Sequence, residues 1–392
     1  MSTANLNIEK EKMLAPQLRF PEFEGEWENR AMRDFTKINQ GLQIPISERF
    51  YEKADDNYFY ITNEFLRKGS EKSYFIKNPS ESVICYEDDI LMTRTGNTGQ
   101  VVTGVHGAFH NNFFKIKYDK TCDKWFLYYF LTSHKTQHTI LKLAGTSTIP
   151  DLNHGDFYKI TLNSPSVYEQ QKIASFLSAV DKKIQQLSRK KELLGQYKKG
   201  VMQQLFSGKL RFKDENGKAY PDCEEKKLGE VGKFYAGGDL DKLNNSKTKS
   251  EEFIYPIYAN GSGEGIYGYA TTFQYKKNSV TVSGRGNLGY ANIRTQNFNA
   301  IVRLIVIEPK DNINSKYLEE IINQTKFAIE STGVPQLTVP QIKSYKISIP
   351  SLPEQQKIAH FLSGIDGKIE QVNGELVKTQ LFKKGLLQQM FV

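Results

Sequence analysis

The sequence is poor in cysteine and has no long run of apolar residues. Its three cysteines, Cys85, Cys122 and Cys223, lie far apart and form neither a CxxC pair nor a disulfide framework, so reduced thiols in a cytoplasm are the plain interpretation. No apolar stretch approaches the roughly 18–20 residues that span a bilayer, and the best one, residues 301–307, is interrupted by Arg303. The N-terminal residues lack a basic start and an apolar segment. We therefore expect a cytoplasmic protein that is neither secreted nor embedded in a membrane.

Motifs for catalysis and metal binding are also missing. The sequence contains no P-loop, no GxSxG elbow and no Asn-Pro-Pro-aromatic motif of amino-methyltransferases. The pairs His106-x-x-x-His110 and His134-x-x-x-His138 have helical ligand spacing but no third ligand nearby. We expect no catalytic residue and no metal site, and hence a chain that catalyses nothing by itself.

The composition indicates a folded, basic chain of more than one domain. Its 392 residues suffice for two or three domains, and an aromatic content of 12% is too high for a disordered chain. Lys and Arg number 53 against 44 Asp and Glu, which gives a formal net charge of +9. This excess favours an anionic partner such as nucleic acid, although both signs are abundant and many basic proteins bind none.

The chain repeats itself. The segment Glu169-Gln-Gln-Lys-Ile173-Ala-Ser-Phe176 returns 185 positions later as Glu354-Gln-Gln-Lys-Ile358-Ala-His-Phe361. Further on, Lys198-Lys-Gly200 returns as Lys383-Lys-Gly385 at the same offset, as a helix of fixed length requires. Upstream the offset drifts, as loops with insertions produce: Leu18-Arg-Phe20 matches Leu210-Arg-Phe212, and Thr95-Gly-Asn-Thr-Gly99 matches Arg285-Gly-Asn-Leu-Gly289. Two copies are too few for a solenoid and suit a molecule with two-fold pseudo-symmetry.

Both strictly repeated segments are predicted to be long helices. Ser166-x-x-Glu169 and Ser351-x-x-Glu354 are capping boxes at their starts. Apolar residues follow at steps of three and four and form one stripe on each helix, with Tyr197 and Phe382 among them. Each helix would be about 55–60 Å long.

The two apolar stripes are expected to pack on each other as an antiparallel coiled coil, because a lone helix of this length has nowhere to bury its stripe. The alternative is that each helix covers the core of its own domain. Several glycines inside the helices mark either close helix contacts or a local break, namely Gly195, Gly200, Gly364, Gly367 and Gly374.

The regions before the two helices are predicted to be mixed globular domains. Strand-like stretches lie at residues 58–62, 89–93, 113–118, 280–283 and 301–307. Helical patterns lie at 125–143 and 315–330, and a short strand precedes each long helix, at 157–162 and 345–349. The fold class is therefore α+β, with two pseudo-symmetric globular domains separated by two long antiparallel coiled-coil helices. The boundaries are a tail at 1–17, a first domain at 18–165, a first helix at 166–209, a second domain at 210–350 and a second helix at 351–392.

Each globular domain contains two polar loops that suit an anionic ligand. A Gly-rich loop follows a strand at 94–100 and again at 283–290, and each carries an arginine and an asparagine. Glycine allows the backbone to approach a ligand closely, Arg suits guanine or phosphate, and Asn suits adenine edges. A second loop follows each helical pattern, at 145–149 and 331–336, where hydroxyls and amides could hold phosphates. The alternatives are an ordinary hairpin loop and an ordinary helix end.

This layout resembles the DNA specificity subunit of type I restriction-modification systems. The resemblance covers nearly the whole chain and rests on two globular regions, each followed by a helix that opens with Pro-x-x-x-Glu-Gln, at 165–170 and 350–355. The segment Leu18-Arg-Phe-Pro-Glu-Phe-Glu-Gly-Glu-Trp27 is also typical of that family. The tail at 1–17 matches nothing in the second half.

The resemblance implies a subunit that reads a bipartite, asymmetric DNA site through two target-recognition domains. The helices would act as spacers between the half-sites, and the partners would be double-stranded DNA, two methyltransferase subunits and two motor-nuclease subunits. S-adenosylmethionine, ATP and Mg²⁺ would bind to the partners, which would carry out adenine methylation or restriction. The residues expected at DNA are Arg94, Asn97, Thr98, Thr146, Ser147, Lys276, Lys277, Arg285, Asn287 and Gln336. Those expected at the partner-binding spacer helices are Glu169, Gln170, Ile173, Phe176, Glu354, Gln355, Ile358 and Phe361.

Two other functions compete with this interpretation. One is a scaffold that binds no DNA and whose coiled coil bridges partner proteins. The other is a stand-alone nuclease, which the missing metal cluster disfavours.

Overall fold

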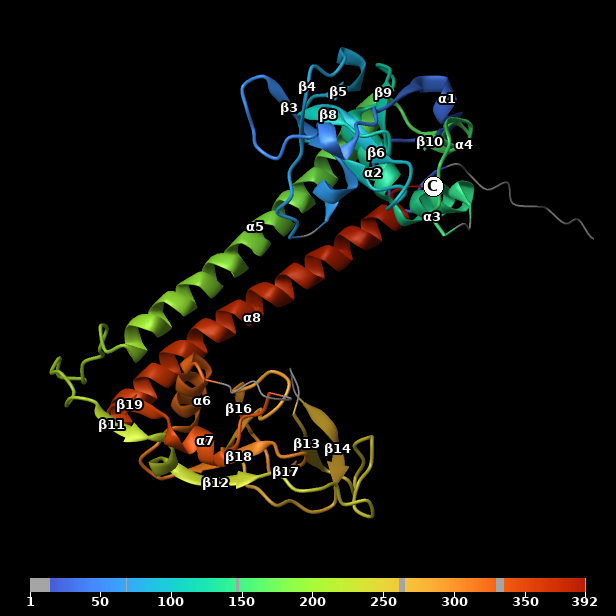
Figure 1. Cartoon of the computed structure of the whole chain (residues 1–392). Helices are drawn as coiled ribbons and strands as arrows, with labels where there is room; N and C mark the ends of the chain where they lie inside the picture. The colour runs from blue at the N-terminus through green and yellow to red at the C-terminus, as the bar shows by residue number, and fades with distance from the viewer. Residues whose placement is uncertain (1–14, 68, 146–147, 261–264, 329–334, 392) are drawn as a thin grey trace, which may run out of the picture. The chain divides into compact units, whose positions relative to one another are not determined.

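The computed structural model describes residues 15–391 apart from 68, 146–147, 261–264 and 329–334. The chain divides into two compact units: residues 1–188 with 374–392, and residues 189–373. Each unit therefore contains one globular domain, the beginning of the helix that follows it and the end of the other long helix (Figure 1).

The first unit combines short strands with four small helices and parts of the two long ones. Its strands are β1 Glu28–Ala31, β2 Thr36–Gln40, β3 Asn57–Ile61, β4 Phe75–Lys77, β5 Ile84–Cys85, β6 Ile90–Thr93, β7 Val101–Val102, β8 Gly107–Phe109, β9 Phe113–Tyr118 and β10 Thr161–Ser164. Its helices are α1 Met32–Phe35, α2 Lys124–Thr132, α3 His134–Ala144, α4 His154–Tyr158 and the start of α5 Val167–Phe206. The strands form sheets in the orders β2-β9-β6-β7, β4-β3-β8-β5 and β1-β10.

The second unit repeats this arrangement. Its strands are β11 Glu224–Lys227, β12 Gly232–Ala236, β13 Tyr255–Tyr258, β14 Ile266–Ala270, β15 Val280–Val282, β16 Ala291–Ile293, β17 Asn299–Ala300, β18 Ile305–Pro309 and β19 Lys346–Ile349. Its helices are α6 Ser315–Gln324, α7 Val339–Ser344 and the start of α8 Leu352–Gln389. The sheets have the orders β12-β18-β15-β16, β14-β13-β17 and β11-β19. The parallel pairing of β3 with β8 recurs as that of β13 with β17, so the repeat extends to sheet topology.

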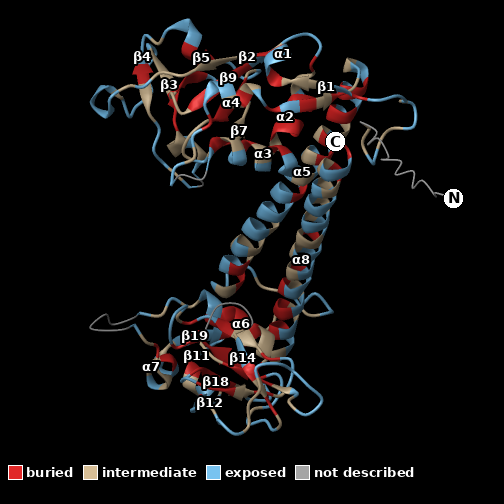
Figure 2. Cartoon of the chain, turned by 90° about the vertical axis from the view of Figure 1, so that its right-hand side faces the viewer, coloured by how far each residue is buried: buried red, intermediate tan, exposed pale blue. Residues whose placement is uncertain are grey.

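Each domain core is closed by both long helices. In the first unit, Ile173 and Leu177 of α5 are buried in one cluster with Phe126 of α2, with Leu386 of α8 and with Met390 directly after α8. In the second unit, Ile358 and Leu362 of α8 share a cluster with Met202 and Leu205 of α5. Figure 2 shows buried segments in red within each domain and on parts of both long helices.

The long helices run antiparallel in both units. In the second unit, Lys191 contacts Asn373 at 2.7 Å and Lys198 contacts Asp366 at 2.7 Å. Residue numbers therefore rise along α5 in the direction in which they fall along α8. In the first unit, Lys383 faces Asp181 at 2.6 Å. The two ion pairs are images of one another, because Lys198 and Lys383, like Asp181 and Asp366, are equivalent positions of the repeat. The expected antiparallel helix pair is confirmed, and each helix also covers a domain core, so the two alternatives hold together.

Two expectations for the helices need correction. Tyr197 and Phe382 do not join the buried stripe, because they are 53% and 54% exposed. The helix glycines mark neither a close contact nor a break, since α5 and α8 are continuous and a Cβ added at any of them would meet no atom within 4 Å. No helix among the described residues is long and apolar enough to cross a membrane.

The globular elements largely follow the predicted pattern, with three instructive differences. The strand expected over 157–162 is displaced, because α4 extends to Tyr158 and β10 begins only at Thr161. The helical stretch at 125–143 is two helices, because Ser133 ends α2 and its hydroxyl accepts the amide of Thr136 to begin α3. The strand expected over 301–307 begins only at Ile305, because the chain first makes a tight turn at Val302 and Arg303.

Candidate nucleic-acid interface

The two Gly-rich loops share one backbone frame. In the first domain, the amide of Thr93 donates to Gln100 and the amide of Gly99 donates back to Thr93. In the second, Ser283 and Tyr290 make the same bond, and Gly289 donates to Ser283. Positive φ angles occur at the equivalent glycines Gly96 and Gly286 (62° and 71°) and at Gly99 and Gly289 (91° and 77°), which explains why glycine recurs there.

An asparagine from a neighbouring strand end braces each loop. Asn63, just after β3, donates its side-chain amide to the carbonyls of Thr95 and Gly96 at 3.1 and 3.0 Å. Asn260, just after β13, accepts the amide of Gly284 at 2.8 Å. The sequence analysis missed both residues. The signal available was an asparagine shortly after an apolar strand in each domain.

In the first domain, the Gly-rich loop is joined to the segment after α3. Arg94 forms an ion pair with Asp151 at 2.5 Å and lies over the ring of Phe114, with its side chain only 18% exposed. The hydroxyl of Thr98 donates to the carbonyl of Pro150 at 2.6 Å. Asn97 is exposed at the loop tip with φ of 66°. Arg94 and Thr98 are thus held by the domain's own groups, and Asn97 is the open member of the predicted trio.

In the second domain, the corresponding loops also meet, but the arginine is open. The amide of Leu337 donates to Gly284, and the guanidinium of Arg285 reaches the side-chain oxygen of Gln336 at 3.3 Å. Arg285 and Asn287 are exposed, and Arg285 has no carboxylate partner among the described residues. The structure therefore brings together three of the predicted residues here, whereas Thr146 and Ser147 lie outside the described residues.

The two lysines expected at phosphates lie apart from the residues around Arg285 and Gln336. Lys276 and Lys277 are exposed and precede β15, while Arg285 follows it. Because an extended strand carries its ends apart at about 3.3 Å per residue, the lysines and the Gly-rich loop occupy opposite ends of β15. Their role at DNA stays a prediction, but they do not belong to one cluster with Arg285.

The glutamates of the repeated motif serve the fold of this chain. Arg19 donates from Nε and Nη2 to both carboxylate oxygens of Glu169, at 2.7 and 2.8 Å. Arg211 does the same to Glu354, at 2.7 and 2.6 Å. The hydrogen bonds from these carboxylates raise the pKa of both arginines above the usual value. Arg19 and Arg211 are the central residues of the matched Leu-Arg-Phe segments, so the repeat contained this signal.

These ion pairs correct the expected capping boxes. The hydroxyl of Ser166 accepts the amide of Glu169 at a long 3.4 Å, but that carboxylate pairs with Arg19 and does not complete the box. The hydroxyl of Ser351 is buried without a hydrogen-bond partner among the described residues. The serine–glutamate spacing predicts a hydrogen bond within the first turn of each helix. The structure shows instead that each glutamate is bound by an arginine distant in sequence.

The neighbouring glutamines are buried connectors. Gln170 accepts the amide of Asp123 at 2.8 Å, next to the start of α2, and Gln355 accepts the amide of Asn314, next to the start of α6, at the same distance. Ile173 and Ile358 are core residues, and Phe176 and Phe361 pack edge to face on Phe20 and Phe212, each at 5.7 Å. These residues attach each domain to its helix. Contact of any of them with a partner subunit stays a prediction.

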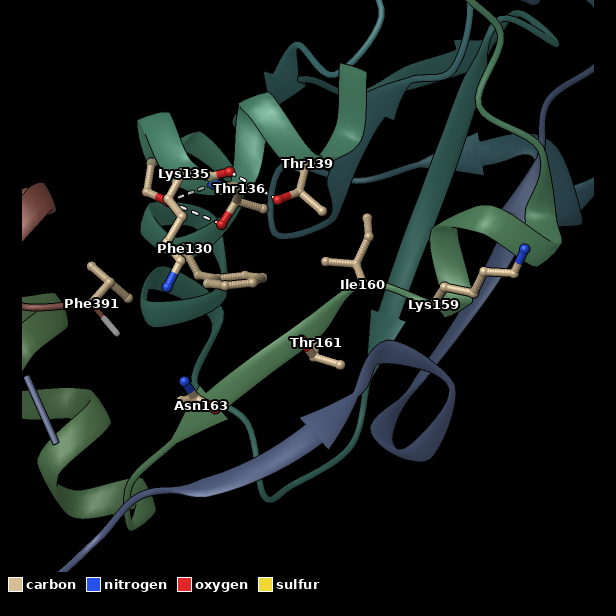
Figure 3. A pocket seen from close by; sticks show the side chains of 10 residues that line it. Phe130, Lys135, Thr136, Thr139, Lys159, Ile160, Thr161, Asn163 and Phe391 are labelled. Atoms are coloured by element: carbon tan, nitrogen blue, oxygen red, sulfur yellow. Dashed lines mark hydrogen bonds between the residues drawn. The ribbon is translucent and has the colours of Figure 1, made fainter. Parts of the chain in front are cut away.

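A small hollow in the first unit lies away from the Gly-rich loop. Figure 3 shows it between α3 and β10, with a volume of about 140 Å³ and a lining that includes Phe130, Thr136, Lys159 and Phe391. Sites for drug-sized ligands usually measure about 300–1,000 Å³, so this hollow is too small to be the candidate site. Among the described residues, no group of three or more His, Cys, Asp or Glu side chains is arranged to hold a metal.

Comparison with known proteins agrees with this duplicated architecture. The family described as "Type I restriction modification DNA specificity domain" matches residues 24–195 and 220–378. The type I restriction enzyme MjaVIII specificity subunit of Methanocaldococcus jannaschii is 27% identical over 94% of this chain and 92% of its own length. The putative type I specificity subunit S.MpnORF507P of Mycoplasma pneumoniae is 32% identical over 59% of this chain, and the match spans 61% of that relative.

A solved structure supports the fold. The S subunit of a type I restriction-modification system from M. genitalium superposes with a TM-score of 0.64 over 96% of this chain and 99% of the other, at 19% identity. The family match covers both globular domains and most of both long helices, which are the parts that the repeat and the sheet topology show to be duplicated. The chain belongs to the family of type I restriction-modification DNA specificity subunits.

Proposed function

We propose that this chain reads a bipartite, asymmetric DNA site, with one half-site for each globular domain. The observation that supports this most strongly is the pair of equivalent Gly-rich loops, which share a hydrogen-bond frame but present different side chains. A shared frame suits docking on the same kind of groove, and different side chains suit different bases. The net charge of +9 would add sequence-independent attraction to phosphates.

We further propose that two methyltransferase subunits bind this chain at equivalent places on the long helices. Tyr197 on α5 and Phe382 on α8 are equivalent positions of the repeat, and both are about half exposed. Leu193, four residues before Tyr197, and Leu381, directly before Phe382, are also exposed, although they are not equivalent positions of the repeat. Exposed apolar residues at related positions suit two copies of one partner, since each copy would meet the same kind of surface.

The catalytic steps would belong to the partners. On this proposal the methyltransferase subunits bind S-adenosylmethionine and modify adenine, and two motor-nuclease subunits bind ATP and Mg²⁺ in the full complex, which would act in the cytoplasm. The contribution of this chain is to choose the sequence and to position the partners on it.

The long helices would set the gap between the two half-sites. Four extra residues lengthen a helix by about 6 Å, which is close to two base-pair steps of DNA. We expect insertion of four residues in α5, together with four at the equivalent point of α8, to lengthen the preferred gap by roughly two base pairs and to leave both half-sites unchanged. Methylome sequencing of cells that express the variant with its modification subunits measures both quantities.

A control and a contrary outcome complete this experiment. Four residues inserted in the exposed Lys213–Ala219 hairpin lengthen the chain without lengthening a helix, so the gap should stay as it is. An unchanged gap in the helix variant would refute the spacer role. If the wild-type assembly methylates no bipartite site, and its DNA affinity is flat with salt and independent of sequence, the scaffold function is favoured instead.

A further inference from the structure

The turn at Val302 and Arg303 is strained. Both residues have positive φ, 53° and 57°, and Val302 is branched at Cβ. Residues with a Cβ pay an energetic penalty in this region, and turns with two positive φ angles normally use Asn, Asp or Gly. Such outliers persist where the surrounding structure holds them, often at functional sites.

The equivalent turn of the first domain is relaxed. Asn111 and Asn112 occupy the same place, because Asn111 donates to Leu42 as Val302 donates to Gly238, and Phe113 donates to His110 as Leu304 donates to Ile301. Neither asparagine has a positive φ, although asparagine tolerates one better than valine does. The fold therefore permits an unstrained turn here, and the strain is particular to the second domain.

Neighbouring groups fix the strained turn to the Gly-rich loop. The amides of Val302 and Arg303 donate to Gly238 and Gly237 at 2.9 and 3.0 Å. Asn260 donates to the carbonyl of Val302 at 2.5 Å while it accepts the amide of Gly284 at 2.8 Å. The carbonyl oxygen of Arg303 would lie 3.3 Å from a Cβ placed on Gly284. One asparagine thus joins the two loops, and Arg303 and Arg285 are exposed residues of these adjoining loops.

Neither arginine of these loops has a carboxylate partner among the residues that the structure describes. Arg303 is exposed, and its guanidinium forms no hydrogen bond or ion pair with the residues that the structure describes. Arg285 reaches only the neutral Gln336. Two guanidinium groups on adjoining loops attract an anionic or acceptor-rich surface, and a guanidinium can bind guanine O6 and N7 with two hydrogen bonds.

We propose that Arg303 is a specificity-determining residue of the second domain, which contacts a base edge in the half-site that this domain reads. The inference rests on the proposed DNA-reading function and deepens it by naming a residue. The strained turn holds the backbone of Arg303 in a fixed position next to the loop of Arg285. The strain energy is the cost of holding it there.

Three substitutions test this proposal in the full chain, co-expressed with its modification subunits. Arg303→Asn removes the guanidinium and supplies a residue that tolerates positive φ. Arg303→Lys keeps the charge but cannot bind two acceptors in one plane. Val302→Asn relieves strain and leaves Arg303 in place, so it is the matched control. The measurements are the thermal unfolding midpoint and binding to a duplex library randomised in both half-sites.

If Arg303 contacts a base, replacing it with asparagine should make the chain more stable and weaken its recognition of DNA. Arg303→Asn should raise the unfolding midpoint yet weaken binding to the preferred site roughly ten- to a hundredfold, with relaxed preference at one or two positions of one half-site only. Arg303→Lys should keep general affinity but lose that preference, and Val302→Asn should raise the midpoint with unchanged binding.

Two outcomes would overturn it. If Arg303→Asn leaves affinity and preference unchanged while the wild-type assembly still selects a bipartite site, this inference fails and the proposed function stands. If Arg303→Asn weakens all sequences equally and lowers the salt dependence by about one charge, Arg303 contacts phosphate and not a base. A wild-type assembly that selects no sequence would instead refute the proposed function itself.

Discussion

The two domains have the same frame but use their arginines differently. Arg94 of the first domain is paired with Asp151 and stacked on Phe114, whereas Arg285 of the second is exposed and hydrogen-bonds the neutral Gln336. The backbone bonds around the two loops are nevertheless the same. The repeat has therefore retained the main-chain geometry of the loops, while the side chains that this geometry presents have diverged.

The same contrast holds at the other end of the strand before each loop. The second domain has Lys276 and Lys277 before β15, whereas the first has Tyr86 and Glu87 at the equivalent positions before β6, followed by Asp88 and Asp89. A surface that is basic in one domain and acidic in the other cannot bind phosphate in the same way in both. The duplicated frame is thus a common scaffold and not a common binding site.

The largest effect is expected at the ion pairs that attach each domain to its long helix. These pairs test whether the two copies of the repeat are stabilised equally. Arg211→Ala leaves the carboxylate of Glu354 fully buried without its partner, and loss of one member of a buried pair costs about 3–5 kcal/mol of unfolding free energy. Arg19→Ala should have a similar effect through Glu169, which is 2% exposed. Urea unfolding followed by circular dichroism measures both losses.

A double variant separates the pair from the packing around it. Arg211→Met with Glu354→Met removes both charges and should be much less destabilising than Arg211→Ala, because no unpaired charge remains. Equal losses in the single and double variants would contradict the interpretation of Arg211 as a counter-charge.

The second prediction follows from the difference between Arg94 and Arg285. Arg285→Ala should weaken DNA binding by about 1–3 kcal/mol, since it removes an exposed guanidinium at the proposed interface. Arg94→Ala should change DNA affinity less and lower the thermal unfolding midpoint more, because its group stabilises the first domain. Fluorescence anisotropy and calorimetry on the same variants measure the two quantities. The reverse ranking in DNA affinity would show that Arg94 leaves Asp151 for DNA.

Replacing glycines inside the long helices should have a smaller effect on stability, and the effect should be stabilising. Gly364 lies in the second unit and Gly385 in the first, and a Cβ at either would meet no atom within 4 Å. Replacement by alanine should stabilise the chain by about 0.5–1 kcal/mol at each site through helix propensity. The thermal midpoint of the isolated chain checks this. A lower midpoint would contradict the continuous helices, whereas a higher midpoint with weaker partner binding would place a partner on that face.

The equivalent ion pairs between the helices should give the smallest effects. Asp181 pairs directly with Lys383 and also accepts a hydrogen bond from the hydroxyl of Tyr129, while Lys198 and Asp366 belong to a network with Glu320. Partly exposed pairs contribute about 0.2–1 kcal/mol, and we expect a larger coupling in the networked pair. Double-mutant cycles with neutral replacements measure both couplings. A larger coupling for Lys383 and Asp181 would show that the network adds nothing.

Local sequence patterns predicted most of the fold. The strict offset and the apolar periodicity located α5 and α8 to within a few residues, and strand β9 begins and ends where the pattern placed it. Of the predicted loops, the Gly-rich loop of the second domain contacts its second loop through Arg285 and Gln336, whereas that of the first domain contacts Asp151, which lies just beyond the predicted loop at 145–149. The contact of these residues with DNA stays a prediction. Asp151, Asn63 and Asn260 were missed, because nothing local in their sequence indicates which distant loop they bind.

The sequence by itself determined the duplication, the two long helices and the α+β character of the domains, because these depend on periodicity and spacing along the chain. Only the tertiary structure decided which charged groups are neutralised. Glu169 looks like a helix cap until Arg19 is seen on it, and Arg94 looks like a DNA contact until Asp151 is seen beside it. A side chain's availability depends on neighbours from other parts of the chain, and folding alone brings those neighbours together.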